Sequence, residues 1–185
     1  MVKDILVDAE KRMTKAVEVV RDELVKIRTG KATTTLLDGV KVDYYGTMTP
    51  LKQIANISTP DAHLITVQPW EKGMIQPIEK AILNANLGLN PANDGALIRV
   101  PIPPLNEERR KELVKLVKKF AEEGKVAVRN VRRDAIEHLK KTEKQDHISE
   151  DERKRAETEV QKQTDKHIKD IDTIVAHKEK EIMEV

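Results

Sequence analysis

The stretch "IRVPIPPLNEERRKELVK", residues 98–115, changes character near its middle. Its first half alternates like a strand and contains Pro101, Pro103 and Pro104, and proline is nearly excluded from helix interiors. Its second half is highly charged, and from Leu113 onward apolar residues recur every three or four positions, the period of a helix. The chain therefore joins two kinds of structure at this point.

The same contrast divides the whole sequence. Residues 31–106 contain all eight prolines and three of the four aromatic residues, but only 12 charged residues. The flanking segments contain the other 54 charged residues and no proline, so they are free to form long helices. Because aromatic residues make up only 2% of the chain, both parts need aliphatic cores.

Three long helices are predicted in the flanking segments. The second begins after Asn106, which can cap it, and the third begins at Ser149, which forms a capping-box pattern with Glu152. The apolar positions expected to face the core are Leu6, Ala9, Met13, Ala16, Val20, Leu24 and Ile27, then Leu113, Val117, Phe120, Gly124, Ala127, Val131 and Ala135, then Ala156, Val160, Thr164, Ile168, Ile171, Val175 and Ile182. Such narrow stripes need partners in water, so the three helices are expected to form one bundle.

The expected bundle consists of residues 1–29 and 106–185, with residues 31–104 inserted as a separate domain after the first helix. The insert leaves and re-enters the bundle through two linkers, one with glycine and one stiffened by proline. We therefore expect a hinge of limited freedom at 29–31 and 101–105. Its residues are Thr29, Gly30, Lys31, Pro101, Pro103 and Pro104.

The insert is expected to be a small α+β domain. Its alternating segments predict strands at 39–46, 53–59, 63–70 and 96–103, the last of them an edge strand, and a short helix at 74–86. Trp70 has two possible roles, as a cover over the sheet or as a contact for a partner. The sequence leaves that choice open.

The sequence offers no catalytic set. The absence of cysteine excludes disulfides, zinc–thiolate sites and a thiol nucleophile. The five histidines are scattered, with His63 in a strand and His167 and His177 expected on the surface or in the seam of the bundle, and no nucleotide-binding or hydrolase motif occurs. We expect no enzyme, metal or cofactor. With no signal-peptide core and no run of ~18 apolar residues, the protein is expected to be cytoplasmic, without membrane contact.

The best candidate for a binding site is the arginine cluster at Arg129, Arg132 and Arg133. At about 100° per residue, these side chains span roughly 100° of the second helix, and Lys125 and Lys140 lie on the same side. The acidic residues that could pair with them and leave only a solvated face are Glu122, Asp134 and Glu137.

Both interpretations of the arginine cluster stay open, although arginine suits phosphate better than lysine does. The near-absence of aromatic residues restricts any RNA partner to structured RNA, bound through charge and shape. Arg110 falls in the apolar register of the same helix. It either extends toward water at the end of the bundle or faces a ligand beside the hinge.

Four ordered motifs together resemble the ribosome recycling factor family over the whole chain. They are "KIRTGKATTTLLDGVKVDYYGTMTPLKQIANI" (26–57), "KAILNANLGLNP" (80–91), the opening stretch (98–115) and "VAVRNVRRDA" (126–135). The resemblance implies an L-shaped molecule, in which a three-helix bundle is joined by a flexible hinge to a β/α/β domain.

The resemblance also implies a function. A factor of this family binds the post-termination ribosome on large-subunit rRNA and, with elongation factor G and GTP, separates the subunits so that mRNA and tRNA are released. The family's rRNA-facing arginines match Arg110, Arg129 and Arg132, while Arg28 lies beside the hinge and Arg133 adds charge. We expect a monomer that is no enzyme itself. The competing hypothesis is a helical protein-interaction adaptor without RNA contact, and a hydrolase ranks third.

Overall fold

A computed structural model describes residues 1–145 and 147–184, so Asp146 and Val185, both inside the predicted 106–185 segment, lie outside the described residues. The chain forms two compact units. The first combines Met1–Arg28 with Glu107–Glu184, and the second is continuous from Thr29 to Asn106. Among the described residues, no helix is long and apolar enough to cross a membrane.

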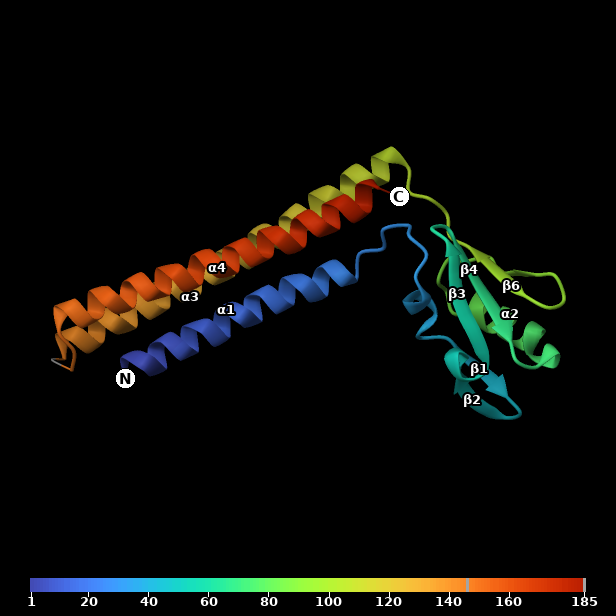
Figure 1. Cartoon of the computed structure of the whole chain (residues 1–185), viewed down its shortest axis with the longest axis horizontal. Helices are drawn as coiled ribbons and strands as arrows, with labels where there is room; N and C mark the ends of the chain where they lie inside the picture. Colours follow the sequence, from blue (N-terminus) through green and yellow to red (C-terminus); the bar gives the residue numbers. More distant parts are fainter. Residues whose placement is uncertain (146, 185) are drawn as a thin grey trace. The chain divides into compact units, whose positions relative to one another are not determined.

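The first unit is a bundle of three long helices. They are α1 (Val2–Val25), α3 (Glu107–Lys144) and α4 (Glu150–Met183). Each helix packs against the other two, and α3 runs antiparallel to both α1 and α4 (Figure 1). With 38 residues, α3 is about 57 Å long at 1.5 Å per residue.

The buried stripe of each bundle helix follows the predicted period, with local differences. The buried residues are Ala9, Met13, Val17, Val20 and Leu24 in α1, Leu113, Val117, Ala121, Gly124, Val128, Val131, Ala135, Leu139 and Thr142 in α3, and Ala156, Val160, Thr164, His167, Ile171 and Ile182 in α4. Six predicted core positions are only half-buried, namely Leu6, Ala16, Phe120, Ala127, Ile168 and Val175. Each helix packs against two neighbours, so its buried stripe is wide. The next apolar position inward can lie three or four residues along, and the choice between them shifts the buried position by one.

Besides Thr142 and Thr164, the polar residues of this bundle core include a histidine. His167 is 3% exposed, its Nδ1 lies 2.7 Å from the carbonyl oxygen of Gln163, and its Nε2 lies 3.2 Å from Thr14 Oγ1. The histidine therefore links α4 to α1 with its polar atoms satisfied. Of the two positions expected for it, surface or seam, it occupies the seam.

The corner between α3 and α4 is fixed by polar contacts. Ser149 caps α4, because its side chain accepts a hydrogen bond from the backbone N–H of Glu152, as predicted. Arg153 is 15% exposed and lies 2.7 Å from Glu143 at the end of α3 and 2.6 Å from Glu157. These contacts hold the two helices antiparallel across the short connection.

The second unit contains two antiparallel sheets and one helix. The strands are β1 (Lys41–Tyr44) and β2 (Thr47–Pro50) in a two-stranded ribbon, and β3 (Ala55–Asp61), β4 (Leu64–Pro69), β6 (Ile98–Pro101) and β5 (Ala92–Asn93), in that order, in a four-stranded sheet. Helix α2 (Ile75–Asn84) buries Ile75, Ile78 and Ile82 in an aliphatic core shared with Ile65 and Val100. The α+β fold expected from the sequence is confirmed.

One prediction for the insert is wrong. The strand within 96–103 is not an edge strand, because β6 lies between β4 and β5. Strand β5 has two residues, too few to show a pattern in the sequence. Of the two roles left open for Trp70, the structure does not favour the cover, since Trp70 is 69% exposed and aliphatic side chains fill the core.

Both linkers are fixed to the turn between β3 and β4. The backbone N–H of Ala32 donates to Ala62 O and that of Ile102 donates to His63 O, both at 2.7 Å. His63, predicted in a strand, lies in this turn, and its Nδ1 is 3.2 Å from the carbonyl oxygen of Gly30. Each linker is therefore held by hydrogen bonds to the insert near the point where it joins the insert.

Candidate nucleic-acid interface

The arginine cluster lies on the solvent side of α3. Arg129 and Arg132 are half-buried and Arg133 is exposed, whereas Val128 and Val131 face the core. Helical periodicity thus gives the cluster one face, as predicted.

Two basic residues on this face are paired with carboxylates. Arg129 Nη1 lies 3.0 Å from Glu122 Oε1, and Lys125 Nζ lies 2.5 Å from Asp172 Oδ1 on α4. The Lys125 side chain is 22% exposed, so its pairing with Asp172 also packs α3 against α4. A phosphate approaching Arg129 or Lys125 competes with an existing ion pair.

Arg132 has a different partner. Its Nη1 donates to the side-chain oxygen of Gln161 on α4 at 3.2 Å, and Gln161 Nε2 donates in turn to Asp165 Oδ1 at 2.8 Å. A neutral amide orients the guanidinium without cancelling its charge. The arrangement leaves Arg132 positioned and positive, as an anion contact requires.

The acidic residues nearest to the cluster are engaged elsewhere. Asp134 Oδ2 accepts from Arg12 on α1 at 2.7 Å, and this hydrogen bond raises the pKa of the Arg12 guanidinium. Glu137 lies 2.9 Å from Lys141, whose hydrogen bond lowers the pKa of the Glu137 carboxyl. Of the three carboxylates that could neutralise the cluster, only Glu122 does so. Among the described residues, no carboxylate forms an ion pair with Arg132 or Arg133.

The other predicted site residues are not part of this cluster. Arg110 lies in the first turn of α3, roughly 30 Å along the helix from Arg129 and Arg132. It is half-buried, and its Nε is buried without a hydrogen-bond partner in the described part of the chain. Arg28 is exposed, three residues beyond the end of α1. Both lie at the end of the bundle where the insert is attached.

The predicted hinge residues differ in environment. Thr29 is 6% exposed, Gly30 has a φ of +76°, and Lys31 is exposed. On the returning linker, Pro101 belongs to strand β6, whereas Pro103 and Pro104 are exposed outside any strand. The part of the returning linker without strand pairing therefore begins after Pro101.

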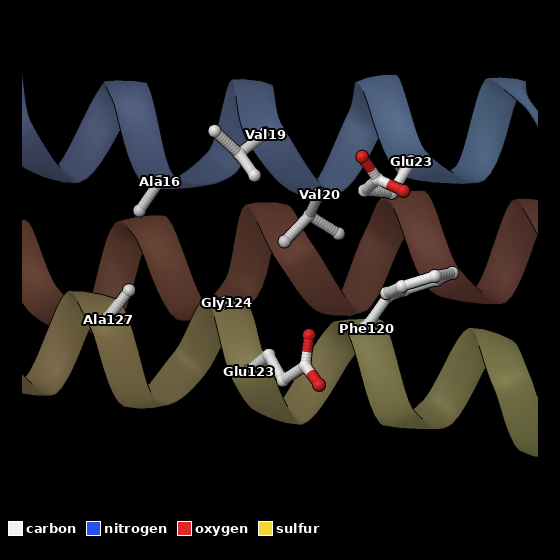
Figure 2. A pocket seen from close by; sticks show the side chains of 8 residues that line it. All are labelled: Ala16, Val19, Val20, Glu23, Phe120, Glu123, Gly124 and Ala127. Atoms are coloured by element: carbon white, nitrogen blue, oxygen red, sulfur yellow. The ribbon is translucent and has the colours of Figure 1, made fainter.

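A separate hollow of about 170 Å³ lies between α1 and α3 (Figure 2). Its lining is apolar except for two carboxylates, and consists of Ala16, Val19, Val20, Glu23, Phe120, Glu123, Gly124 and Ala127. Such a lining cannot bind an anion. The described residues also contain no group of three or more potential metal ligands.

Gln161 was not predicted as a site residue, because nothing in the sequence of α4 marks it as a partner of α3. A glutamine on a charged helix has no distinctive pattern, and its role appears only when α3 and α4 are packed together. The engagement of Asp134 by Arg12 is equally invisible, because 122 positions separate the two residues.

Comparison with known proteins identifies the family. The family model described as ribosome recycling factor matches residues 20–183. The ribosome-recycling factors of Syntrophomonas wolfei and Trichlorobacter lovleyi are 55% and 58% identical over 185 residues, and each alignment covers 100% of both chains.

Solved structures agree. The solution structure of a ribosome recycling factor has a TM-score of 0.75 at 48% identity, covering 100% of this chain and 98% of that one. A second match is the T. thermophilus ribosome recycling factor, described with the E. coli elongation factor G bound to the E. coli post-termination complex. Its TM-score is 0.62 at 47% identity, with 98% of each chain covered. With relatives above 50% identity over its whole length, the chain belongs to the ribosome recycling factor family.

Proposed function

We propose that this protein binds the post-termination ribosome through the arginine face of its bundle, on structured large-subunit rRNA, and acts there with elongation factor G and GTP to separate the subunits. The observation that carries the proposal is the charge of Arg132 and Arg133. Neither is neutralised by the nearby carboxylates, because Asp134 and Glu137 are bound to other basic residues.

The fixed direction of the Arg132 side chain favours a role in binding phosphate over a role in solubility alone. A surface arginine with no function has no need of a partner that fixes its direction, yet Gln161 holds Arg132 from the neighbouring helix. The aromatic shortage argues against splayed single-stranded bases, since stacking needs aromatic platforms and the bundle contains only Phe120. Phosphate charge and the shape of folded RNA are what such a face can recognise.

The two-unit architecture supports the second half of the proposal. The insert is joined to the bundle only by the two linkers in sequence, so a force on the insert can move it while the bundle stays bound. GTP hydrolysis belongs to elongation factor G, and this chain contributes binding and transmission of movement, as a monomer and without chemistry of its own. The match to a recycling factor described with elongation factor G on a post-termination complex supports this pairing of partners.

The decisive experiment is the splitting of post-termination ribosomes by this protein with elongation factor G and GTP, followed by light scattering. Dissociation is expected only when all three components are present. Binding to isolated large subunits is measured in parallel over a range of salt concentrations. The binding constant should fall log-linearly with salt if phosphates are contacted, whereas binding that barely responds to salt would favour the adaptor hypothesis.

A further inference from the structure

The insert exposes its aromatic residues. Tyr45 is 80% exposed and Trp70 is 69% exposed, while the core of the same unit is built from aliphatic side chains. Tyr44 is half-buried and contacts Tyr45 edge-to-face, with ring centroids 4.7 Å apart and planes at 74°. Three of the four aromatic residues of the chain thus lie in one small unit, where Tyr44 packs against the aliphatic core and Tyr45 and Trp70 are exposed.

Tyr45 occupies a position where the backbone disfavours it. The loop between β1 and β2 has two residues, since Tyr44 pairs with Thr47, and both loop residues have positive φ, +50° at Tyr45 and +87° at Gly46. This is the geometry of a type I′ turn, for which Asn-Gly is the favoured pair. A tyrosine in this left-handed region is uncommon and destabilises the turn relative to asparagine. The geometry of the turn therefore gives no reason for an aromatic residue at this position.

One carboxylate organises this aromatic surface. The Tyr44 hydroxyl donates to Glu71 Oε1 at 2.5 Å and the Tyr45 hydroxyl donates to Glu71 Oε2 at 2.8 Å. Glu71 directly follows Trp70 in the chain, so the exposed indole is attached one residue away from the carboxylate that the two phenols share. The two hydrogen bonds lower the pKa of Glu71, and no basic side chain in the described part of the chain forms an ion pair with it.

The chemistry of this surface selects its partner. Aromatic faces attract cations, and arginine does so best because its planar guanidinium can stack on a ring while its N–H groups donate to a carboxylate. A phosphate backbone is repelled by Glu71. We propose that the surface formed by Tyr44, Tyr45 and Glu71, with Trp70 next to Glu71 in the chain, binds an exposed arginine of a protein partner. This arginine-binding surface belongs to the insert alone and is independent of the arginine face on the bundle.

The proposal is tested directly by the fluorescence of Trp70, the only tryptophan in the chain. The full-length protein is titrated with an acetylated, amidated peptide of alternating arginine and glycine, and in parallel with the same peptide carrying citrulline for arginine and with an oligouridylate. The arginine peptide is expected to change the fluorescence saturably at millimolar concentrations, with an affinity roughly tenfold above that of the citrulline peptide.

Glu71→Gln tests the carboxylate without changing its shape. It should weaken binding of the arginine peptide about fivefold. A fluorescence response to oligouridylate that equals or exceeds the response to the arginine peptide would assign the surface to RNA and overturn the proposal. Absence of any saturable response to the arginine peptide would overturn it as well.

Tyr45→Asn separates binding from folding. Because asparagine suits the turn, this variant should keep or raise the melting temperature of the protein while losing most of its affinity for the arginine peptide. Tyr45→Phe is the matched control, since it keeps the ring and removes only the hydroxyl, and it should retain most of the affinity. A Tyr45→Asn variant that binds the peptide as well as the wild type would show that the exposed ring has no part in recognition.

Discussion

Gly124 in α3 lies directly against Val20 in α1, so closely that a Cβ built on Gly124 would be 2.2 Å from Val20 Cγ2 (Figure 2). The next nearest atom, Ile171 Cδ1 of α4, would be 3.3 Å away. All three helices therefore converge at this glycine. The sequence pattern places Gly124 in the apolar register, and the structure confirms that it marks a close approach of helices.

Gly124→Ala should destabilise the protein by up to about 2 kcal/mol. Alanine favours the helix by about 1 kcal/mol over glycine, but overpacking costs about 1–3 kcal/mol, and Val20 is buried with a stiff β-branched side chain that cannot turn aside. Urea denaturation followed by the helical signal in circular dichroism measures the loss.

Two variants serve as controls for Gly124→Ala. At Gly73 an added Cβ meets nothing within 4 Å, so Gly73→Ala should leave stability unchanged within about 0.5 kcal/mol. Adding Val20→Ala to Gly124→Ala frees space for the new methyl group, so the two changes together should cost less than the sum of their separate effects. Strict additivity would contradict the close contact.

Arg132→Ala should weaken binding to large ribosomal subunits strongly and change the stability of the fold by no more than about 0.5 kcal/mol. The slope of log binding constant against log salt should become shallower by roughly one unit, as for a lost phosphate contact. Arg155→Ala is the control, because Arg155 is exposed on α4 about 120° round the helix from Gln161 and its loss changes net charge equally. Equal effects from the two substitutions would mean that the arginine face contributes only its net charge to binding and makes no specific contact.

Gln161→Glu should weaken large-subunit binding nearly as much as Arg132→Ala does. The substitution keeps the shape of the side chain but places a carboxylate where the amide oxygen now lies 3.2 Å from Arg132 Nη1. The resulting ion pair would neutralise the guanidinium, and the new charge would also face Asp165. Filter binding or sedimentation with isolated subunits gives the comparison, and an unweakened Gln161→Glu variant would mean that the charge of Arg132 is not used.

The turn between β5 and β6 should become less stable in acid. Hydrogen bonds from the backbone N–H groups of Leu97 and Ala96 and from Arg99 lower the pKa of Asp94 to about 2. Because the pKa of this folded-state carboxyl lies below that of the unfolded chain, the stabilisation is present above about pH 4 and disappears as the pH falls toward 2.

Carbon-13 NMR titration of the Asp94 carboxyl measures this pKa directly. In a parallel comparison, the stability of Asp94→Asn should fall less than that of the wild type between pH 4 and pH 2, because asparagine does not titrate. A carboxyl that titrates near pH 4 in the folded protein would contradict the hydrogen bonds assigned to it.

Loosening the linkers should separate binding from subunit splitting. Insertion of two glycines between Arg28 and Thr29, and of two more between Leu105 and Asn106, leaves the described core of each unit intact. Large-subunit binding should persist, since the arginine face is on the bundle, while splitting with elongation factor G and GTP should be lost because a slack connection transmits little force. Undiminished splitting by this variant would show that the linkers do not need to transmit a force from the insert to the bundle.

The sequence predicted the elements that have a long or regular pattern. The three bundle helices, α2, and strands β1, β3, β4 and β6 all show periodicity over enough residues to be recognised. Strands β2 and β5 were missed for a physical reason. The four residues of β2 have a mostly exposed pattern, and the two residues of β5 have no pattern at all.

The candidate site was predictable in its residues but not in its electrostatics. Periodicity places Arg129, Arg132 and Arg133 on one face of a helix without any tertiary information. Which of them is neutralised depends on contacts between helices, as with Asp134 and Arg12, and such contacts carry no local signal. The exposure of Trp70 could not be predicted either, because only the packed aliphatic core shows that the sheet needs no aromatic side chain to cover it.

The discontinuity of the bundle has a consequence for biosynthesis. Helix α1 ends at Val25, but α4, one of its two partners, is complete only at Met183, about 160 residues later. At roughly 5–20 residues per second, translation of that interval takes roughly ten to thirty seconds. The insert is continuous in sequence and can fold during this time, while the part of the apolar stripe of α1 that packs on α4 stays without its partner on the nascent chain. In this translation factor, the packing of the first helix is therefore complete only after the last helix has been synthesised.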